Sequence, residues 1–296
     1  MIHKTVLLNE SIEMLNLKKG SIFFDGTLGG AGHTSKVCTD YKNTVKIIAT
    51  DRDNSAIKNA EVKLEKLGCK ANLILSDYRH MDTVLENLQI KKVDAILLDL
   101  GLSSDQLDAS GRGFTFKNNE PLLMTFSEDE QKVNAKVIVN NWSEETISDI
   151  LFGYSDERYS RRIARAIVTS RNIKPIETTF DLIEIIRKAV PKAYEIGKMH
   201  YATKTFQALR IAVNDEISAL KEGMTHGWDY LNIHGRMAII SFHSVEDREV
   251  KNYFRQKVKA GEGKFITKKP ITASETELNE NPRSRSAKLR VIEKTI

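Results

Sequence analysis

The sequence predicts an α/β protein whose mostly parallel sheet is interrupted by an inserted helical segment. Over the first hundred residues, short apolar runs alternate with amphipathic stretches, which is typical of a parallel sheet covered by helices. After Gly101 the strand-like runs stop and helical patterns follow, until the strand pattern returns near Arg236. We therefore expect a discontinuous domain, residues 1–108 and 214–296, and an all-helical insertion, residues 109–213.

The first half of the sheet is predicted from four nearly all-apolar runs, as expected for strands buried on both faces. These predicted strands are residues 21–25, 45–50, 72–76 and 93–98. Helices are predicted between them at residues 34–39, 55–67 and 81–88. In the second of these, Ile57, Ala60, Leu64 and Leu67 recur at helical spacing. Together these segments form a βαβαβαβ unit.

The rest of the chain is predicted in the same way from periodicity. The insertion contains five candidate helices, at residues 128–140, 143–151, 157–170, 180–190 and 203–223. The sheet then resumes with strands at residues 236–242, 264–268 and 287–293, and with a helix at residues 245–258. Residues 272–285 are polar, and we expect a loop there.

Composition narrows the class of protein. With 296 residues, of which 41% are hydrophobic and 29% charged, the chain is neither disordered nor a disulfide-stapled miniprotein. No apolar run approaches the roughly 20 residues of a membrane span, and the N-terminus lacks a leader pattern, so we expect a cytoplasmic protein. Cys38 and Cys69 form no CxxC pattern and are expected to be reduced, packed thiols.

A glycine-rich loop at residues 25–33, DGTLGGAGH, follows the first predicted strand. Glycines here allow a ligand to approach the backbone closely. A dinucleotide fingerprint read from Gly30 would need a third glycine where Ser35 stands, which disfavours a nicotinamide cofactor. Asp25 before the glycines and Asp51 at the end of the second strand fit a ligand with a ribose and a cationic amino-acid tail. S-Adenosylmethionine has both; the alternative is a turn without a ligand.

Two further strand ends carry candidate residues. Tyr78, after the third strand, either offers a face to an adenine or is only packed. Asp99, at the end of the fourth strand, either contacts the cofactor alone or accepts an N–H from a nucleobase amine. The second role would be catalytic, because the lone pair of such an amine is delocalised into the ring and an acceptor would localise it. Asp53 is expected to cap the helix that follows the second strand.

Seven ordered blocks of sequence resemble the ribosomal RNA small-subunit methyltransferase H family, also called MraW, along essentially the whole chain. The blocks are residues 3–10, 25–33, 99–108 with 112–114, 161–168, 202–216, 241–248 and 281–290. The resemblance implies a Rossmann-like class I S-adenosylmethionine-dependent methyltransferase fold. It also implies methylation of the N4 amine of a cytosine in 16S rRNA at the decoding centre of the small ribosomal subunit. The implied cofactor-binding residues are Gly30, Ala31, Gly32, His33, Asp51, Tyr78, Asp99 and Gln106.

The chain departs from the family pattern in a few places. Leu123 and Thr125 stand where the family usually has an acid and an arginine, and Thr115, Tyr201 and Lys204 replace a usual Ser, Pro and Arg. The first departure motivates an alternative function, a non-catalytic rRNA-binding or assembly factor on a methyltransferase fold. A nicotinamide-dependent oxidoreductase is a second alternative, from the generic βαβ pattern. Because methyl transfer from a sulfonium needs no metal, we assign no metal site; a homodimer stays open.

The charge of the chain is unevenly distributed. Residues 158–174 hold six basic groups and residues 281–290 hold four, neither with an acid, whereas the rest carries 35 basic groups (45 less ten) against 40 acidic. Such runs are either solvated faces or RNA contacts, and two of them favour RNA. Phe114 and Phe116 are either base-stacking partners or buried. The candidate RNA-binding residues are Arg158, Arg162, Arg165, Lys204, Arg283 and Arg285.

Overall fold

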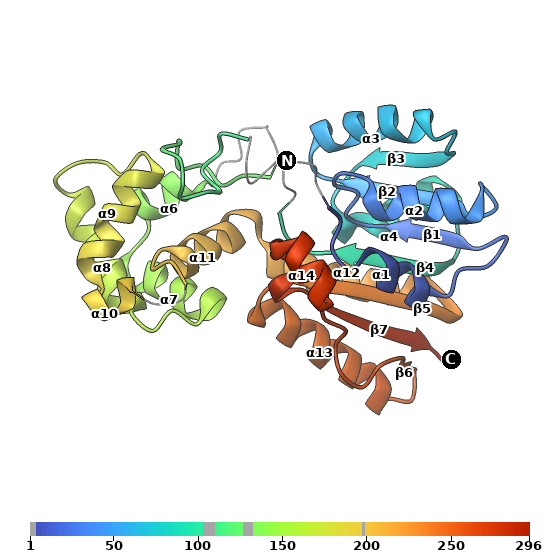
Figure 1. The fold of residues 1–296 in the computed structure, drawn as a ribbon. Coiled ribbons are helices and arrows are strands. Elements are labelled where there is room, and N and C mark those ends of the chain that lie inside the picture. The colour runs from blue at the N-terminus through green and yellow to red at the C-terminus, as the bar shows by residue number, and fades with distance from the viewer. Residues whose placement is uncertain (1–3, 103–109, 127–132, 197–198) are drawn as a thin grey trace. The chain divides into compact units, whose positions relative to one another are not determined.

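The computed structural model describes residues 4–102, 110–126, 133–196 and 199–296 (Figure 1). The chain divides into two compact units. The first comprises Met1–Gly101 and Ile217–Ile296, and the second comprises Leu102–Glu216. Within the described ranges, no helix is long and apolar enough to cross a membrane.

The first unit is built on a seven-stranded sheet with the order β3-β2-β1-β4-β5-β7-β6. All neighbouring strands are parallel except β7, which is antiparallel to β5 and β6. This confirms the predicted class I methyltransferase fold, and the first four strands lie within one residue of their predicted ends. The strands are β1 (Ile22–Asp25), β2 (Lys46–Asp51), β3 (Ala71–Leu75), β4 (Val93–Asp99), β5 (Leu231–Ser241), β6 (Gly263–Phe265) and β7 (Lys288–Lys294).

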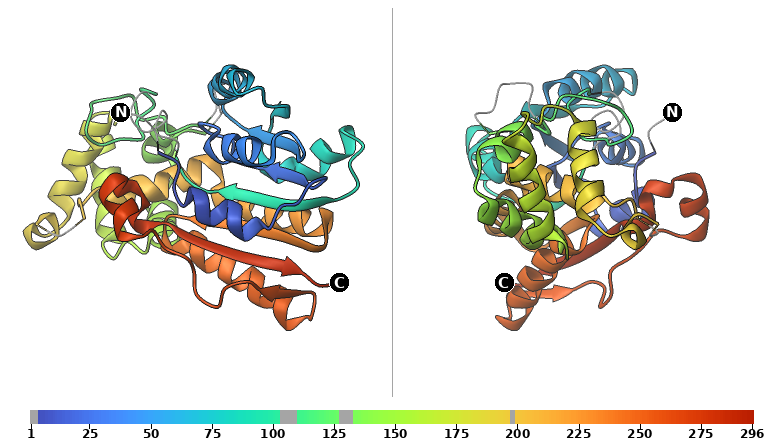
Figure 2. Two further views of the ribbon diagram at one scale, coloured as in Figure 1. Left: turned by 45° about the vertical axis from the view of Figure 1, so that its right-hand side comes forward. Right: turned by 90° about the vertical axis from the view of Figure 1, so that its left-hand side faces the viewer.

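Helices cover both faces of this sheet (Figure 2). Neighbouring side chains on β1 point to opposite faces, so Phe23 packs with α1 and α2, while Phe24 packs with α4, α12 and α13. Helix α3 packs on the same face as α1 and α2. The helices are α1 (Leu8–Leu15), α2 (Gly32–Tyr41), α3 (Asn54–Lys66), η1 (Tyr78–His80), α4 (Met81–Asn87), α12 (Glu216–Tyr230), α13 (Ser244–Lys259), α14 (Glu275–Glu280) and η2 (Pro282–Ser286).

Three predictions for this unit are wrong. The strand expected at residues 236–242 begins five residues earlier, because β5 comprises Leu231–Ser241. Residues 272–285 were expected to be a loop but contain α14 and the start of η2, because Ser274 caps α14 and the Glu277 carboxylate accepts the Leu7 N–H at 2.8 Å. The cysteines are not free thiols, because α2 and the turn before β3 bring Cys38 and Cys69 together in a disulfide with their Cα atoms 5.7 Å apart.

The second unit is helical, and its described helices enclose a core of their own. Ile138, Leu151, Ile163, Leu182 and Leu209 are fully buried in this core. The helices are α6 (Ala135–Asn141), α7 (Glu144–Ser155), α8 (Ser160–Arg171), α9 (Thr179–Ala189), α10 (Lys192–Glu195) and α11 (Thr203–Asn214).

Four predicted helix limits in this unit are wrong. The helix expected at residues 143–151 extends to Ser155, and that expected from residue 157 begins at Ser160. The expected helix at residues 203–223 is broken at Asp215, whose φ of 50° is left-handed, so that α11 ends and α12 begins there. The bidentate ion pair between Arg210 and Glu216, at 2.7 and 2.8 Å, spans this break. The helix expected from residue 128 begins only at Ala135, because Asn134 is its N-cap; residues 127–132 lie outside the described ranges.

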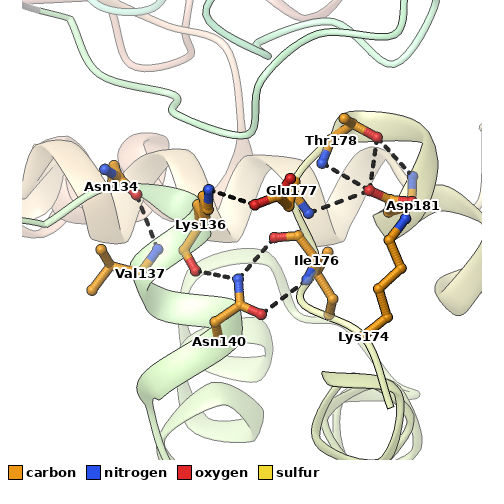
Figure 3. A network of polar contacts seen from close by, with 9 residues as sticks. All are labelled: Asn134, Lys136, Val137, Asn140, Lys174, Ile176, Glu177, Thr178 and Asp181. Carbon is orange, nitrogen blue, oxygen red and sulfur yellow. Dashed lines mark hydrogen bonds and ion pairs between the residues drawn. The ribbon is translucent and has the colours of Figure 1, made fainter. Parts of the chain in front are cut away.

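A polar network joins α6 to the segment before α9 (Figure 3). The Asn140 side chain donates to the Ile176 carbonyl and accepts the Ile176 N–H, at 2.8 and 2.9 Å. A capping box of Thr178 and Asp181 starts α9. Lys174 pairs with Asp181 at 3.7 Å, so one cation of the predicted basic run 158–174 already has an acidic partner.

Candidate functional site

The glycine-rich loop between β1 and α2 is held by the strands beside it. The Gly26 N–H donates to the Leu97 carbonyl of β4, and the Leu28 N–H donates to the Thr50 carbonyl of β2. Asp51, at the end of β2, accepts the Gly29 N–H at 2.8 Å. The other Asp51 oxygen accepts the Asp53 N–H, and Asp53 caps α3 as predicted. The Arg52 N–H also bonds to this carboxylate, which leaves Asp51 a site for one further donor, such as a ribose hydroxyl.

The beginning of α2 leaves no room for a side chain at Gly32. A Cβ built there would lie 1.7 Å from the Thr5 hydroxyl oxygen and 2.8 Å from the Thr5 Cβ. Ala31, directly before it, is fully buried with a left-handed φ of 53°. The N-terminal segment therefore supports the glycine loop from behind, a contact that the sequence did not predict.

Asp25 lies buried beneath this loop, with 1% of its surface exposed. Its carboxylate accepts a hydrogen bond from the Thr34 hydroxyl at 2.7 Å and one from the Thr27 N–H at 3.2 Å. Burial raises the pKa of Asp25 to about 6; the two hydrogen bonds oppose this rise, and the nearby charge of Asp51 adds to it. Asp25 is thus a structural acid that titrates close to neutral pH.

This pKa predicts a pH dependence of stability. Between the ordinary value of 3.8 and about 6, folded Asp25 holds a proton that the unfolded chain has released, so stability falls as pH rises through this window. The difference corresponds to roughly 3 kcal/mol. In Asp25→Asn this contribution is absent. Urea unfolding at several pH values should therefore show that the free energy of unfolding of the variant rises relative to that of the wild type from about pH 4 to about pH 6. A constant difference between the two proteins would contradict this account, and exposed Asp40→Asn is the control.

Asp99 ends β4 beside the loop. Its backbone N–H donates to the Thr27 hydroxyl at 2.6 Å, and one carboxylate oxygen lies 3.8 Å from His33 Nδ1. The other oxygen, Oδ1, is buried, and no described residue donates a hydrogen bond to it. Burial raises the pKa of Asp99 well above its usual range, and repulsion from Asp25 and Glu246 raises it further. A buried acceptor without a partner is costly, so this atom is suited to a ligand.

Glu246 is a neighbour of Asp99 that the sequence analysis missed. It lies in the first turn of α13, where it accepts the Phe242 N–H at 2.9 Å. His243 caps this helix, and its Nε2 lies 3.0 Å from a Glu246 oxygen. The spacing of a cap residue and an acid three positions later, at the end of a strand, is the signal that could have indicated Glu246.

Tyr78 lies in η1, directly after β3. A Cβ added at Gly223 would come 2.5 Å from the Tyr78 ring, so the ring packs closely against α12. The neighbouring Asp77 is engaged by Arg52 at 3.4 Å and by Arg79 at 3.2 Å. The Tyr78 ring is therefore packed on the side that faces α12, and its contact with an adenine remains a prediction. Gln106 lies outside the described residues.

The carboxyl ends of β1, β2 and β4 thus bring together three acids, Asp25, Asp51 and Asp99. Burial raises the pKa of all three, and mutual repulsion contributes for Asp25 and Asp99. A positive charge placed among them would relieve this repulsion. The site is therefore electrostatically suited to a cationic ligand, and the sulfonium and ammonium groups of S-adenosylmethionine fit it.

The predicted RNA-binding residues of the second unit differ in their surroundings. Arg158 and Arg162 are exposed at the start of α8. Arg165 pairs with Glu144 at 3.4 Å, and Lys204 donates to the Asp156 carbonyl at 2.7 Å. Of the two candidate stacking residues, Phe114 is buried against Phe126, and the Phe116 ring stacks on His200 with centroids 4.4 Å apart.

The second basic run is partly neutralised in the first unit. Lys288 and Arg290 bind Asp247 at 3.1 and 2.7 Å. Although burial opposes ionisation of Asp247, hydrogen bonds from Arg290 and Lys288 lower its pKa. Arg283 and Arg285 are exposed on η2, and the Lys288 side chain also reaches the surface although it is paired with Asp247.

Curated relatives resemble this chain from end to end. "Ribosomal RNA small subunit methyltransferase H" of Finegoldia magna is 43% identical over 310 residues, covering 99% of both chains. The protein of the same name from Heliobacterium mobile is 44% identical over 308 residues, covering 99% of this chain and 98% of the relative. The protein of this name from Brevibacillus brevis is 41% identical over 307 residues, covering 99% of this chain and 98% of the relative.

A family model gives the same result. The model of the "MraW methylase family" matches residues 1–295. The topology of the sheet, the acid-rich end of its strands and the relatives along the full chain agree with this match. The chain therefore belongs to the MraW methylase family, and S-adenosylmethionine is its cofactor.

Proposed function

We propose that the protein methylates the N4 amine of a cytosine in 16S rRNA, at the decoding centre of the small ribosomal subunit. The observation that carries this proposal is Asp99 Oδ1, a buried acceptor at the end of β4 that has no partner among the residues the structure describes. Relatives at 41–44% identity bear the name of a small-subunit rRNA methyltransferase, which supports the class of substrate.

The residues that would hold the cofactor lie around the acid-rich strand ends. Bound S-adenosylmethionine supplies a methyl group on a sulfonium that is already an activated leaving group. The glycine loop lets the ligand approach the backbone, Asp51 accepts from ribose hydroxyls, and Asp99 faces positive charge. The proposed cofactor-binding residues are Gly30, Ala31, Gly32, His33, Asp51, Tyr78, Asp99 and Gln106.

Asp99 has a second role in this proposal. The exocyclic amine of cytosine is a poor nucleophile because its lone pair is delocalised into the ring. A carboxylate that accepts one N–H localises that lone pair on nitrogen. Positive charge close to Asp99 lowers its pKa and so favours the ionised acceptor. The amine becomes acidic only after alkylation, so its proton leaves late, to Asp99 or to water.

RNA binding is proposed to involve basic residues of both units. Arg158, Arg162, Arg165 and Lys204 belong to the insertion, which we propose as the RNA-recognition domain, and Arg283 and Arg285 belong to η2. Phosphate contacts of this kind give affinity that falls with salt. The target cytosine must leave its stack to reach the donor, as in other enzymes that modify bases.

Transfer of labelled methyl groups tests the proposal. Small subunits that lack the modification are incubated with protein and labelled S-adenosylmethionine, and the modified nucleoside is identified. We expect N4-methylcytidine; a label on another base, or on the cytosine ring, would contradict the proposal. Binding of rRNA without turnover would instead favour the non-catalytic alternative that Leu123 and Thr125 motivate. Calorimetry with NAD, for which we expect no binding, tests the oxidoreductase alternative.

A further inference from the structure

We propose that Arg158, Tyr159, Arg162 and Tyr194 form a base-stacking site for single-stranded RNA within the helical unit. This inference rests on the proposed function, because that function makes RNA the ligand. It replaces the predicted stripe of arginines along α8 by a compact site at the beginning of that helix, and it assigns the recognition to planar groups as well as to charge.

The four side chains already lie against one another, with each guanidinium over a tyrosine ring. The guanidinium carbon of Arg158 lies 4.8 Å from the ring centroid of Tyr159 and 4.8 Å from that of Tyr194. The guanidinium carbon of Arg162 lies 5.7 Å from the Tyr159 centroid. The two tyrosine rings meet edge to face, 5.0 Å apart at 73°. Both arginines are exposed, so each can offer its outer face to a ligand.

The buried carboxylate of Glu157 holds this arrangement by hydrogen bonds. Glu157 is fully buried, accepts the Tyr194 hydroxyl at 2.7 Å and accepts the Tyr159 N–H at 2.9 Å. Burial, together with the hydrogen bond to Glu157, raises the pKa of Tyr194, so its phenol stays neutral. Because Glu157 is enclosed and occupied by these donors, it orients the rings rather than repelling an anionic ligand.

Positive charge is concentrated at this end of α8. In the part of the chain that the structure describes, no carboxylate lies within ion-pair distance of Arg158 or Arg162. Farther along the same basic run the cations have other partners: Arg165 has Glu144, Arg171 donates to two backbone carbonyls, and Lys174 has Asp181. Lys204 is held at the Asp156 carbonyl, two residues before Arg158.

These features favour single-stranded RNA over other anionic ligands. An acidic peptide would use the charge of the arginines but not the planes of the rings. Unpaired bases stack on aromatic rings and on guanidinium planes while the phosphates meet the positive charge. Bases in a duplex are already stacked on one another and cannot use such a platform. An enzyme that must unstack its target base also acts on unpaired RNA, which agrees with a binding site for single strands.

The test measures binding of the full-length protein to a fluorescently labelled single-stranded oligoribonucleotide by anisotropy. Arg158→Lys keeps the charge but removes the plane. We expect it to bind about tenfold more weakly, with the salt dependence of binding unchanged. Arg187→Ala, an exposed arginine paired with Glu184, is the matched control and should bind as the wild type does. Thermal melting checks that both variants are folded.

Three outcomes would overturn the inference. They are unchanged binding by folded Arg158→Lys, equal affinity for a duplex of the same sequence, and displacement of the RNA by an acidic peptide at similar concentration. Methyl-transfer kinetics separate this inference from the proposed function. A raised KM with unchanged kcat in Arg158→Lys supports the site, whereas methylation with an unaltered KM contradicts the site and leaves the function standing. RNA binding that weakens as expected, in a protein that methylates nothing, contradicts the function alone.

Discussion

Replacing Asp99 by alanine is expected to reduce methyl transfer by about 10²- to 10⁴-fold, while cofactor binding is partly retained. The variant loses the carboxylate oxygen Oδ1, which is buried and lacks a partner in the described part of the chain. The glycine loop and Asp51, with its bonds to Gly29 and Asp53, stay in place. Single-turnover transfer to small subunits measures the chemical step, and calorimetry with S-adenosylmethionine measures binding.

Asp99→Asn separates the two roles that the sequence left open. If Asp99 only contacts the cofactor, the amide weakens cofactor binding and leaves the rate at saturating cofactor unchanged. If it also accepts the amine N–H, the saturated rate falls as well, because a neutral amide oxygen is a weaker acceptor than a carboxylate. Asp40→Ala, an exposed acid paired with Lys36, is the control. A fully active Asp99→Ala enzyme would refute a catalytic role for this residue.

The second large effect is expected for Gly32→Ala, which should weaken binding of S-adenosylmethionine at least about tenfold. The added Cβ would lie 1.7 Å from the Thr5 hydroxyl oxygen, so either the N-terminal segment or the glycine loop must move. Movement of the loop displaces the backbone that a ligand would approach. Calorimetry of the folded variant gives the change in affinity directly.

A second substitution tests the cause of this loss. Thr5→Gly in the Gly32→Ala background removes the colliding side chain and should restore much of the affinity. Gly153→Ala is the control, because Gly153 lies exposed in α7 with nothing within 4 Å of an added Cβ. There we expect unchanged cofactor binding and a slight gain in stability from the better helix former. Failure of Thr5→Gly to restore binding would place the damage elsewhere.

The sequence predicted the sheet well because its strands are continuous apolar runs, which leave little choice of structure. It failed where a tertiary contact decides. The polar segment that contains α14 is helical partly because Glu277 reaches the Leu7 N–H. Helix α11 stops at Asp215, where the backbone turns left-handed although the apolar periodicity continues. The disulfide joins Cys38 and Cys69 across 31 positions, a separation that carries no signal in a single sequence.

In the site, too, the residues placed by strand order could be predicted, whereas those placed by tertiary contacts could not all be. Asp25, Asp51 and Asp99 could be predicted because the carboxyl ends of neighbouring parallel strands meet at one edge of the sheet. Thr5 could not, since its importance comes from a contact with Gly32 across the fold. For Glu246, the capping pattern was a signal in the sequence, but its effect on the pKa of Asp99 depends on the fold.

The basic run 158–174 shows a related limit. The absence of acids within a segment does not mean that its cations are unpaired. Arg165 and Lys174 find their carboxylates on α7 and α9, outside the run. Among the described residues, the structure therefore narrows the surplus of positive charge along α8 to three exposed arginines near its beginning, Arg158, Arg161 and Arg162.

The central claim, methylation of a cytosine amine in small-subunit rRNA, is tested most directly in cells. Nucleoside mass spectrometry compares 16S rRNA from cells with and without this protein, and from cells that carry only the Asp99→Ala variant. The account predicts that N4-methylated cytidine is present with the intact protein, absent without it and strongly reduced with the variant. An unchanged level of N4-methylated cytidine in cells that lack the protein would contradict it.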